Sequence, residues 1–224
     1  MAEIESNIIL FKSLIPGHVK LIAVSKTRPV SDILEAYSAG QRCFGENRVQ
    51  EILNKKDLLP ADIEWHLIGH LQSNKVKAII PYISMIESVD TFKLLSIINS
   101  EAQKINRVVD CLLQIYIADE ETKFGFSINE LTEIGDANGF ADLKNVNICG
   151  VMGMATFTSD LKKVHKEFGY LADCFNILGK KYFSASPDYK EISMGMSGDY
   201  EAAISEGSTM VRIGSLIFGE RIKK

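Results

Sequence analysis

Short apolar runs alternate with longer amphipathic stretches along the chain, and this alternation constrains the fold more than any other feature of the sequence. The apolar runs have the length and β-branched character of strands, whereas the stretches between them carry apolar residues at helical spacing. The predicted strands are residues 21–25, 42–45, 63–69, 85–89, 108–117, 146–152, 191–194 and 210–213. The predicted helices are an opening one over roughly the first fourteen residues, then 30–39, 48–55, 74–80, 92–105, 129–137, 161–178 and 199–205.

Regular alternation of strand and helix predicts parallel strands joined by crossover helices. The runs VVDCLLQIYI (108–117) and VNICGVMGM (146–154) are apolar almost throughout, as expected for strands covered on both faces. Eight such units predict an α/β fold closed into a single (β/α)8 TIM barrel, with an open doubly wound sheet as the alternative. We expect one domain over residues 1–224, with the helix of residues 1–15 packed on the barrel.

Composition argues against several kinds of partner. Apolar residues make up 46% of the chain and charged residues 24%, and the net charge of −4 provides no general attraction to nucleic acid or to an anionic membrane. No segment reaches the length of about 18–20 apolar residues that spans a bilayer, and the N-terminus does not resemble a secretory signal. These features predict a cytoplasmic protein that binds neither nucleic acid nor membrane.

The cysteines indicate a reducing compartment and no metal site. None of the four forms a C-x-x-C pair or another metal-type spacing: Cys43, Cys111, Cys149 and Cys174. Three of them lie in apolar stretches, so buried free thiols are expected, with a disulfide framework as the alternative. Free thiols fit the cytoplasm.

Three residues predict where helices begin or end. Thr91 directly precedes an amphipathic stretch, and its hydroxyl can accept a bond from the first backbone N–H groups of that helix. Gly40 follows a predicted helix and suits a left-handed C-terminal cap. Gly179 predicts the same kind of ending for the helix at residues 161–178.

Functional side chains of a barrel lie on the loops that follow the carboxyl ends of its strands. Lys26 comes directly after LIAVS, where it is either a solvated boundary residue or an amine able to form a Schiff base. The loops SMGMSG (193–198) and RIGS (212–215) follow the last two predicted strands and carry Gly and Ser at their turns. Such turns let backbone N–H groups approach a phosphate at the start of a helix, and barrels frequently bind phosphate at these two loops.

Two polar side chains lie inside predicted strands. A buried arginine is costly unless paired, so Arg212 predicts either an ion pair with a neighbouring strand or a donor held toward a bound ligand. His66 predicts either a structural hydrogen bond or a pocket residue.

These residues belong to segments that together resemble the pyridoxal phosphate homeostasis protein family, which itself resembles the N-terminal barrel domain of alanine racemase. The resemblance extends from about residue 20 to residue 221 and includes five motifs in the expected order. The motifs are AVSKT (23–27), FGENRVQE (44–51), WHLIGHLQSNK (65–75), SMGMSGDYEAAI (193–204) and GSTMVRIGSLIFGER (207–221). The resemblance implies a barrel of the fold type III class that binds pyridoxal 5′-phosphate (PLP).

The resemblance also implies the roles of particular residues. It implies PLP held as an internal aldimine on Lys26, with Arg212 facing the pyridine nitrogen. The expected phosphate contacts are Gly195, Ser197, Gly214 and Ser215, and Asn47 and His66 belong to motifs that line the pocket. Two positions depart from the usual pattern. His70 stands where proline is common, and Lys123-Phe124-Gly125 stands where Lys-Ser-Gly or Lys-His-Gly is frequent, so only the pocket rim or a partner surface is affected.

The function that the resemblance implies is storage, buffering or delivery of PLP rather than catalysis. PLP is the best electron sink when its pyridine nitrogen is protonated, and Arg212 cannot accept that proton. The chain ends at Lys224, so we expect no second domain supplying an opposite base, and we expect a monomer whose partners are PLP and PLP-dependent apoenzymes. One alternative is a PLP-dependent racemase or lyase of the alanine racemase type, with a base from Tyr82, Tyr116 or Lys123. Another is a phosphate-binding barrel without imine chemistry.

Overall fold

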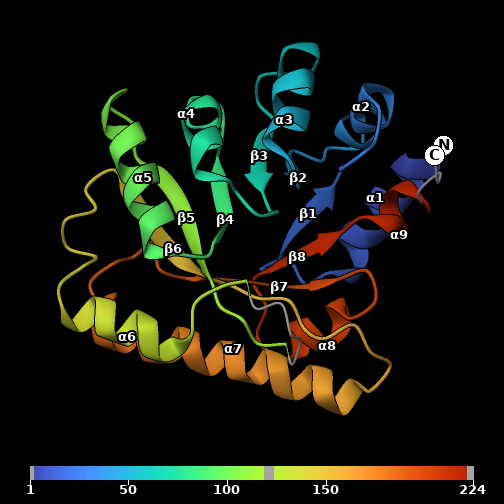
Figure 1. The fold of residues 1–224 in the computed structure, drawn as a ribbon. Coiled ribbons are helices and arrows are strands. Elements are labelled where there is room, and N and C mark those ends of the chain that lie inside the picture. Colours follow the sequence, from blue (N-terminus) through green and yellow to red (C-terminus); the bar gives the residue numbers. More distant parts are fainter. Residues whose placement is uncertain (1–2, 119–123, 221–224) are drawn as a thin grey trace.

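The computed structural model describes residues 3–118 and 124–220, and its strands form a closed parallel barrel (Figure 1). Each strand pairs with the next in the chain, and the last strand pairs with the first. The strands are β1 (Lys20–Val24), β2 (Cys43–Glu46), β3 (Glu64–Leu67), β4 (Met85–Val89), β5 (Val109–Gln114), β6 (Val146–Met152), β7 (Glu191–Met196) and β8 (Met210–Ile213). The predicted eight-stranded α/β barrel is confirmed, and the open sheet is wrong.

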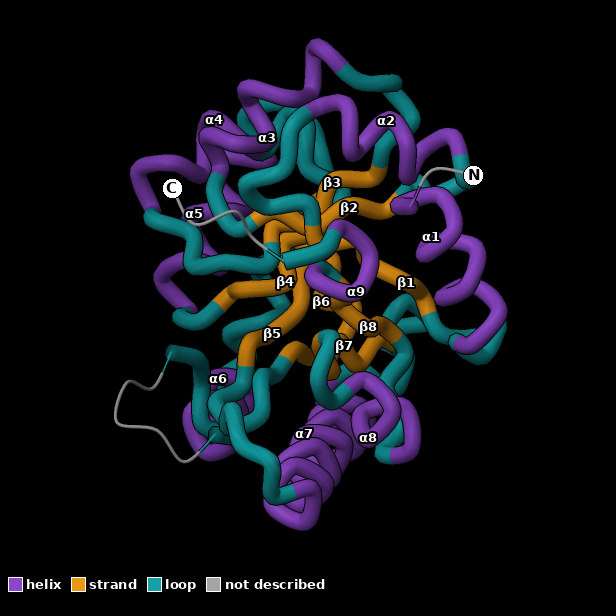
Figure 2. The backbone as a smooth tube through the Cα atoms, turned by 90° about the vertical axis from the view of Figure 1, so that its right-hand side faces the viewer, coloured by secondary structure: helices purple, strands orange, loops and turns teal. Residues whose placement is uncertain are grey.

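Helices surround the strands (Figure 2). They are α1 (Glu3–Leu14), α2 (Val30–Ser38), α3 (Val49–Lys55), α4 (Val76–Ile79), α5 (Phe92–Gln103), α6 (Ile128–Asp136), α7 (Leu161–Tyr182), α8 (Tyr200–Ser205) and α9 (Ser215–Phe218). Two short 3-10 turns, η1 (Lys56–Leu58) and η2 (Ser73–Lys75), precede β3 and α4. The helix predicted at 74–80 is therefore split between η2 and α4, and α9 was not predicted.

The opening helix lies on the outside of the barrel. Its first backbone N–H groups, of Ile4 and Glu5, donate to Glu35 Oε1 of α2 at 2.8 and 3.1 Å. At its middle, the Asn7 amide donates to the carbonyl of Ile217 in α9 at 3.0 Å. Helix α1 is therefore bonded to the helix that follows it, α2, and to the last described helix, α9. Among the described residues, no helix combines the length and apolarity needed to cross a membrane.

Two of the three predicted helix ends are confirmed. Thr91 caps α5, its hydroxyl accepting a backbone N–H bond 3.2 Å long, and Gly40 has φ +83° after α2. The ending at Gly179 is wrong, because α7 continues to Tyr182. Gly179 instead makes room for a neighbouring ring: a Cβ there would lie 3.0 Å from Cε1 of Tyr189.

The barrel interior is apolar in one part and polar in another. A cluster of buried side chains fills the apolar part: Ile22, Cys43, Met85, Leu112, Cys149, Met152 and Met210. Arg212 lies two residues after Met210 on β8 and so points to the same side of the strand. The apolar cluster is therefore followed, toward the carboxyl ends of the strands, by the polar side chain of Arg212 inside the barrel. All four cysteines are buried and free, which confirms that prediction.

A glycine sets the contact between β6 and β7. Gly150 has φ +150°, and a Cβ at this position would lie 1.8 Å from the carbonyl oxygen of Glu191. We expect Gly150→Ala to lower the free energy of unfolding by about 3 kcal/mol or more, because the backbones of two barrel strands must separate. Urea denaturation measures this loss. The control is Gly17→Ala, where a Cβ meets nothing within 4 Å, and equal stability of the two variants would contradict the prediction.

Candidate functional site

A cavity of about 600 Å³ lies at the carboxyl ends of the strands. Its walls come mainly from the segments after β1, β2, β3, β6, β7 and β8, which is the barrel end where sites are expected. Six of the eight predicted site residues line it: Lys26, Asn47, Ser197, Arg212, Gly214 and Ser215. Gly195 and His66 are not part of its lining and lie in β7 and β3.

The loops after β7 and β8 meet at one wall of the cavity. The backbone N–H of Gly214 donates to Ser197 Oγ at 3.3 Å, which joins the two loops. Gly195 has φ +93°, and a Cβ there would lie 2.5 Å from Cβ of Ala203, so glycine lets β7 approach α8. The Ser197 and Ser215 hydroxyls are thus brought to the same wall as Gly214, whose N–H bonds to Ser197. This is the arrangement that an anion such as phosphate requires.

The turn that carries Lys26 is fixed on both sides. Thr27 has φ +65°, an unfavourable conformation for a β-branched residue, and its backbone N–H donates to Glu51 Oε2 at 2.6 Å. On the other side, the Ser25 hydroxyl donates to Glu46 Oε1 at 2.7 Å. The segment after β1 is therefore held by carboxylates from β2 and α3, through the Ser25 hydroxyl and the Thr27 backbone, and Lys26 between them lines the cavity.

A buried ion-pair network around Lys55 holds the residues that fix this turn. Lys55 is 8% exposed, and its Nζ donates to Glu46 Oε1 at 2.7 Å, to Glu51 Oε2 at 3.0 Å and to the Ser25 carbonyl at 3.1 Å. Glu46 is fully buried, and within the described part of the chain its Oε2 has no hydrogen-bond partner. Burial raises the pKa of Glu46 to about 7, although Lys55 and Ser25 act in the opposite direction. The sequence did not reveal this network, whose only local signal is the Glu51–Lys55 pair one helical turn apart.

Because its pKa is raised on folding, Glu46 predicts a pH dependence of stability. The ordinary carboxyl pKa is 4.5, so between that pH and about 7 the folded state binds a proton that the unfolded chain releases. Stability therefore falls as pH rises across this window, by up to about 3 kcal/mol at 1.36 kcal/mol per unit. We expect Glu46→Gln to remove most of this slope, measured by urea unfolding at pH 5 and pH 8. The exposed Glu133→Gln is the control, and an unchanged slope in Glu46→Gln would contradict the assignment.

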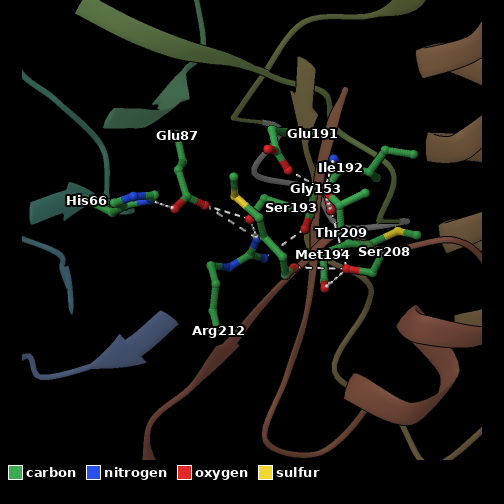
Figure 3. Close-up of polar contacts among 11 residues, drawn as sticks. His66, Glu87, Gly153, Glu191, Ile192, Ser193, Met194, Ser208, Thr209 and Arg212 are labelled. Carbon is green, nitrogen blue, oxygen red and sulfur yellow. Dashed lines mark hydrogen bonds and ion pairs between the residues drawn. The ribbon is translucent and has the colours of Figure 1, made fainter. Parts of the chain in front are cut away.

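Arg212 lies at the base of the cavity in a network of hydrogen-bonded side chains that crosses the barrel (Figure 3). It is 3% exposed and donates from Nη1 to Ser193 Oγ at 2.6 Å and from Nη2 to the Gly153 carbonyl at 2.9 Å. The Ser193 hydroxyl donates to Glu87 Oε2 at 2.5 Å, and that oxygen lies 3.9 Å from Arg212 Nη1. His66 Nδ1 lies 2.6 Å from Glu87 Oε1 at the far end of this network (Figure 3). The sequence suggested an ion pair with a neighbouring strand, but Glu87 belongs to β4, across the barrel from β8.

The buried charged side chains of this network stabilise one another. Burial alone would raise the pKa of Glu87, but the hydrogen bond and charge of His66 and the charge of Arg212 lower it. Burial alone would lower the pKa of His66, but Cys43 and Glu87 raise it to about 10. Burial lowers the pKa of Arg212, and Glu87 opposes this effect. These interactions favour the ionised form of Glu87, which acts on Arg212 by its charge at 3.9 Å and through the Ser193 hydroxyl.

The loop after β6 contributes a wall that the sequence did not indicate. Met154, Ala155, Thr156, Phe157 and Thr158 all line the cavity. Glu167 of α7, itself buried, accepts from Thr156 N and from Thr156 Oγ1, each at 2.7 Å, and so holds the loop against the barrel. Phe157 is 98% exposed at the rim. The polar stretch TFTSD after a predicted strand end was the available signal.

The candidate bases of the racemase alternative lie elsewhere. Tyr82 precedes β4 and therefore lies at the opposite end of the barrel from the cavity. Tyr116 follows β5 but does not belong to the cavity lining, and Lys123 is outside the described residues.

Of the positions that depart from the family pattern, His70 has Nδ1 2.6 Å from Asp90 Oδ2, and its ring centroid lies 5.3 Å from that of Phe124.

Comparison with known proteins first identifies the class of barrel. The family described as alanine racemase, N-terminal domain, matches residues 1–222. An alanine racemase from Clostridium difficile 630 superposes with a TM-score of 0.79 over 99% of this chain and 58% of that chain, at 15% identity, which shows a shared fold. The structure is thus a barrel of the alanine racemase N-terminal type.

More similar proteins narrow this class. A pyridoxal phosphate homeostasis protein of Aquifex aeolicus is 41% identical over 90% of this chain and 87% of its own length. A protein of the same name from Escherichia coli K12 is 38% identical over 92% and 87%. The structure of PipY from Synechococcus elongatus PCC7942, described with PLP bound, has 34% identity and a TM-score of 0.86, covering 96% of this chain and all of that one. The chain belongs to the pyridoxal phosphate homeostasis protein family, which confirms the resemblance found in its sequence.

Proposed function

We propose that this protein binds PLP and acts in its homeostasis by storing, buffering or delivering the cofactor. The observation that carries the proposal is the convergence of Lys26, the joined Ser197 and Gly214 loops, and Arg212 on one cavity. The names of the curated relatives and the PLP-bound PipY structure support it. A cavity of about 600 Å³ also lies in the range of small-molecule sites, roughly 300–1,000 Å³.

The residues present fit the parts of this cofactor. PLP brings an electrophilic aldehyde, a phosphate and a pyridine nitrogen. The amine of Lys26 would hold the aldehyde covalently, and Arg212, fixed by its hydrogen bonds, would face the ring nitrogen. The proposed phosphate donors in the cavity wall are Ser197, Gly214 and Ser215, and Gly195, which lies outside the lining, would shape the loop that carries Ser197. We assign Asn47 to the cavity wall, and we assign His66 an indirect role, since it reaches Arg212 only through Glu87.

We propose further that holding the cofactor, rather than turning over a substrate, is the main activity. Arg212 cannot accept a proton from the ring nitrogen, which weakens the electron sink that PLP enzymes use. Within residues 3–118 and 124–220, the titratable side chains that line the cavity are Lys26, Arg28, Asp199 and Arg212. Asp199 already accepts a bond from the Met196 N–H at 2.5 Å, beside the proposed phosphate donors.

An amino-acid racemase or lyase is the second candidate, and Asp199 is the observation that favours it. Burial raises the pKa of this carboxyl, as in many acid–base catalysts. Chiral analysis of amino acids after incubation with PLP-loaded protein separates the two candidates. We expect no turnover approaching about 1 s⁻¹, the low end of typical enzymes, and turnover at that rate that is lost in Asp199→Asn would establish catalysis instead.

Several properties of the whole chain are part of the proposal. We assign residues 1–224 to one cofactor-binding domain that acts as a monomer in the cytoplasm and passes PLP to apoenzymes. The four free, buried cysteines fit a reducing compartment. Light scattering of the PLP-loaded protein tests the monomer, since a mass of twice 24.9 kDa would contradict it.

Delivery can be tested by reactivating a PLP-dependent apoenzyme. The PLP-loaded protein and an equal concentration of free PLP are each mixed with the apoenzyme, with and without a phosphatase that destroys free PLP. We expect the loaded protein to restore activity when the phosphatase is present, because its cofactor is shielded in the cavity. Equal loss of activity in both mixtures would contradict storage and delivery.

A further inference from the structure

A second group of reactive side chains lies away from the proposed PLP cavity, toward the amino ends of the strands. Cys43 is on β2, and Glu64 and His66 are on β3; the ligand-type atoms of these three residues lie within 4.8 Å of one another. Cys43 pairs with Glu64 in the strand register, and Glu64 and His66 are two residues apart, so all three point to the same side of the sheet. We propose that these side chains form a Zn²⁺ site.

The orientation of His66 suits metal binding. Its Nδ1 lies 2.6 Å from Glu87 Oε1, so this nitrogen donates to the carboxylate, and Nε2 is directed to the side where Cys43 lies. A carboxylate that holds the second nitrogen of a histidine is the usual support of a zinc ligand. Glu87 is fully buried and receives a further bond from the Ser193 hydroxyl at 2.5 Å, so the histidine ring is firmly held.

The site can be reached from solvent. A surface cavity of about 340 Å³ is lined by Cys43 and Glu64, and it provides an entry path. Lys20 Nζ lies 3.5 Å from Glu64 Oε2, but the two side chains are 43% and 50% exposed. An exposed pair of this kind contributes little, so a divalent cation would displace the ammonium from Glu64 at small cost.

The donor set favours zinc. One sulfur, one imidazole nitrogen and one carboxylate oxygen are ligands that Zn²⁺ accepts, and water would complete a tetrahedral site. On binding, the protons carried by Cys43 Sγ and His66 Nε2 would leave to solvent, and the thiolate and the neutral imidazole would coordinate the ion. The cysteine pattern gave no sign of such a site, because Cys43 is on a different strand from the other two ligands.

The test uses PLP-loaded protein freed of metal with a chelator that is then removed. Zn²⁺ is titrated in competition with a chromophoric chelator, and Co²⁺ is added separately to detect the thiolate-to-cobalt charge-transfer band. We expect about one Zn²⁺ per chain in wild type. Cys43→Ser should weaken binding by about 100-fold and abolish the cobalt band, and Glu64→Gln should weaken binding by about tenfold. Cys149→Ser is the matched control, since Cys149 is buried in the same interior cluster, and it should bind as wild type does.

Circular dichroism and the PLP absorbance band accompany each titration. Both should be unchanged in Cys43→Ser and Glu64→Gln, because neither residue belongs to the PLP cavity. If Cys43→Ser does not fold, the half-exposed Glu64→Gln decides by itself. The proposal is overturned if wild type binds Zn²⁺ no more tightly than Glu64→Gln, or if Cys149→Ser loses binding to the same extent.

Discussion

Replacing Lys26 with alanine is expected to abolish covalent attachment of PLP. Lys26 lines the cavity together with the proposed phosphate donors, and carboxylates on both sides of its turn fix its position. The phosphate contacts remain in the variant, so weakened non-covalent binding should persist while the imine absorbance band disappears. Titration of PLP into purified wild type and variant, followed by absorbance, measures both effects.

Lys77→Ala is the control for this experiment. Lys77 is exposed on α4, and we expect its replacement to leave the imine band at full intensity. An imine band of wild-type intensity in Lys26→Ala would show that another amine carries the cofactor.

Replacing Arg212 with methionine should strongly lower both stability and PLP affinity. The change removes the cation beside Glu87 while the carboxylate stays fully buried, and it leaves the Gly153 carbonyl without its donor. Breaking a buried pair in this way costs about 3–5 kcal/mol. We expect a loss of this size in urea denaturation, and at least tenfold weaker PLP binding where the variant still folds.

The double variant Arg212→Met with Glu87→Gln separates folding from cofactor binding. Removing the carboxylate charge should recover part of the lost stability, because no buried carboxylate then lacks the Arg212 cation, and His66 without Glu87 beside it can be neutral. PLP binding should stay weak, since the donor at the cavity is still missing. Full recovery of PLP affinity in the double variant would show that Arg212 has only a structural role.

The architecture could be predicted because local pattern determines it. Parallel strands read as apolar runs, and the run at residues 146–152 became β6 with the same bounds. Prediction was wrong where a distant residue decided the outcome. Gly179 has the local character of a helix end, but packing against Tyr189 keeps it inside α7.

The residues of the site likewise fall into those that local sequence could indicate and those that depend on distant partners. Lys26 and the Ser197 and Gly214 loops could be found because each directly follows a strand, and barrel geometry then brings strand ends together. Glu46 and Glu87 could not be found, because the role of each depends on a buried partner on another element: Lys55 on the following helix and Arg212 on the opposite strand. Sequence spacing contains little information about such partners, so buried networks emerged only from the structure.

The central claim is that Lys26 holds PLP in this barrel, and one measurement tests it most directly. PLP-loaded protein is reduced with borohydride, digested and mapped by mass spectrometry. We predict one pyridoxyl group per chain, on the peptide that contains Lys26. A protein without the adduct, or an adduct on a peptide that does not contain Lys26, would contradict the account.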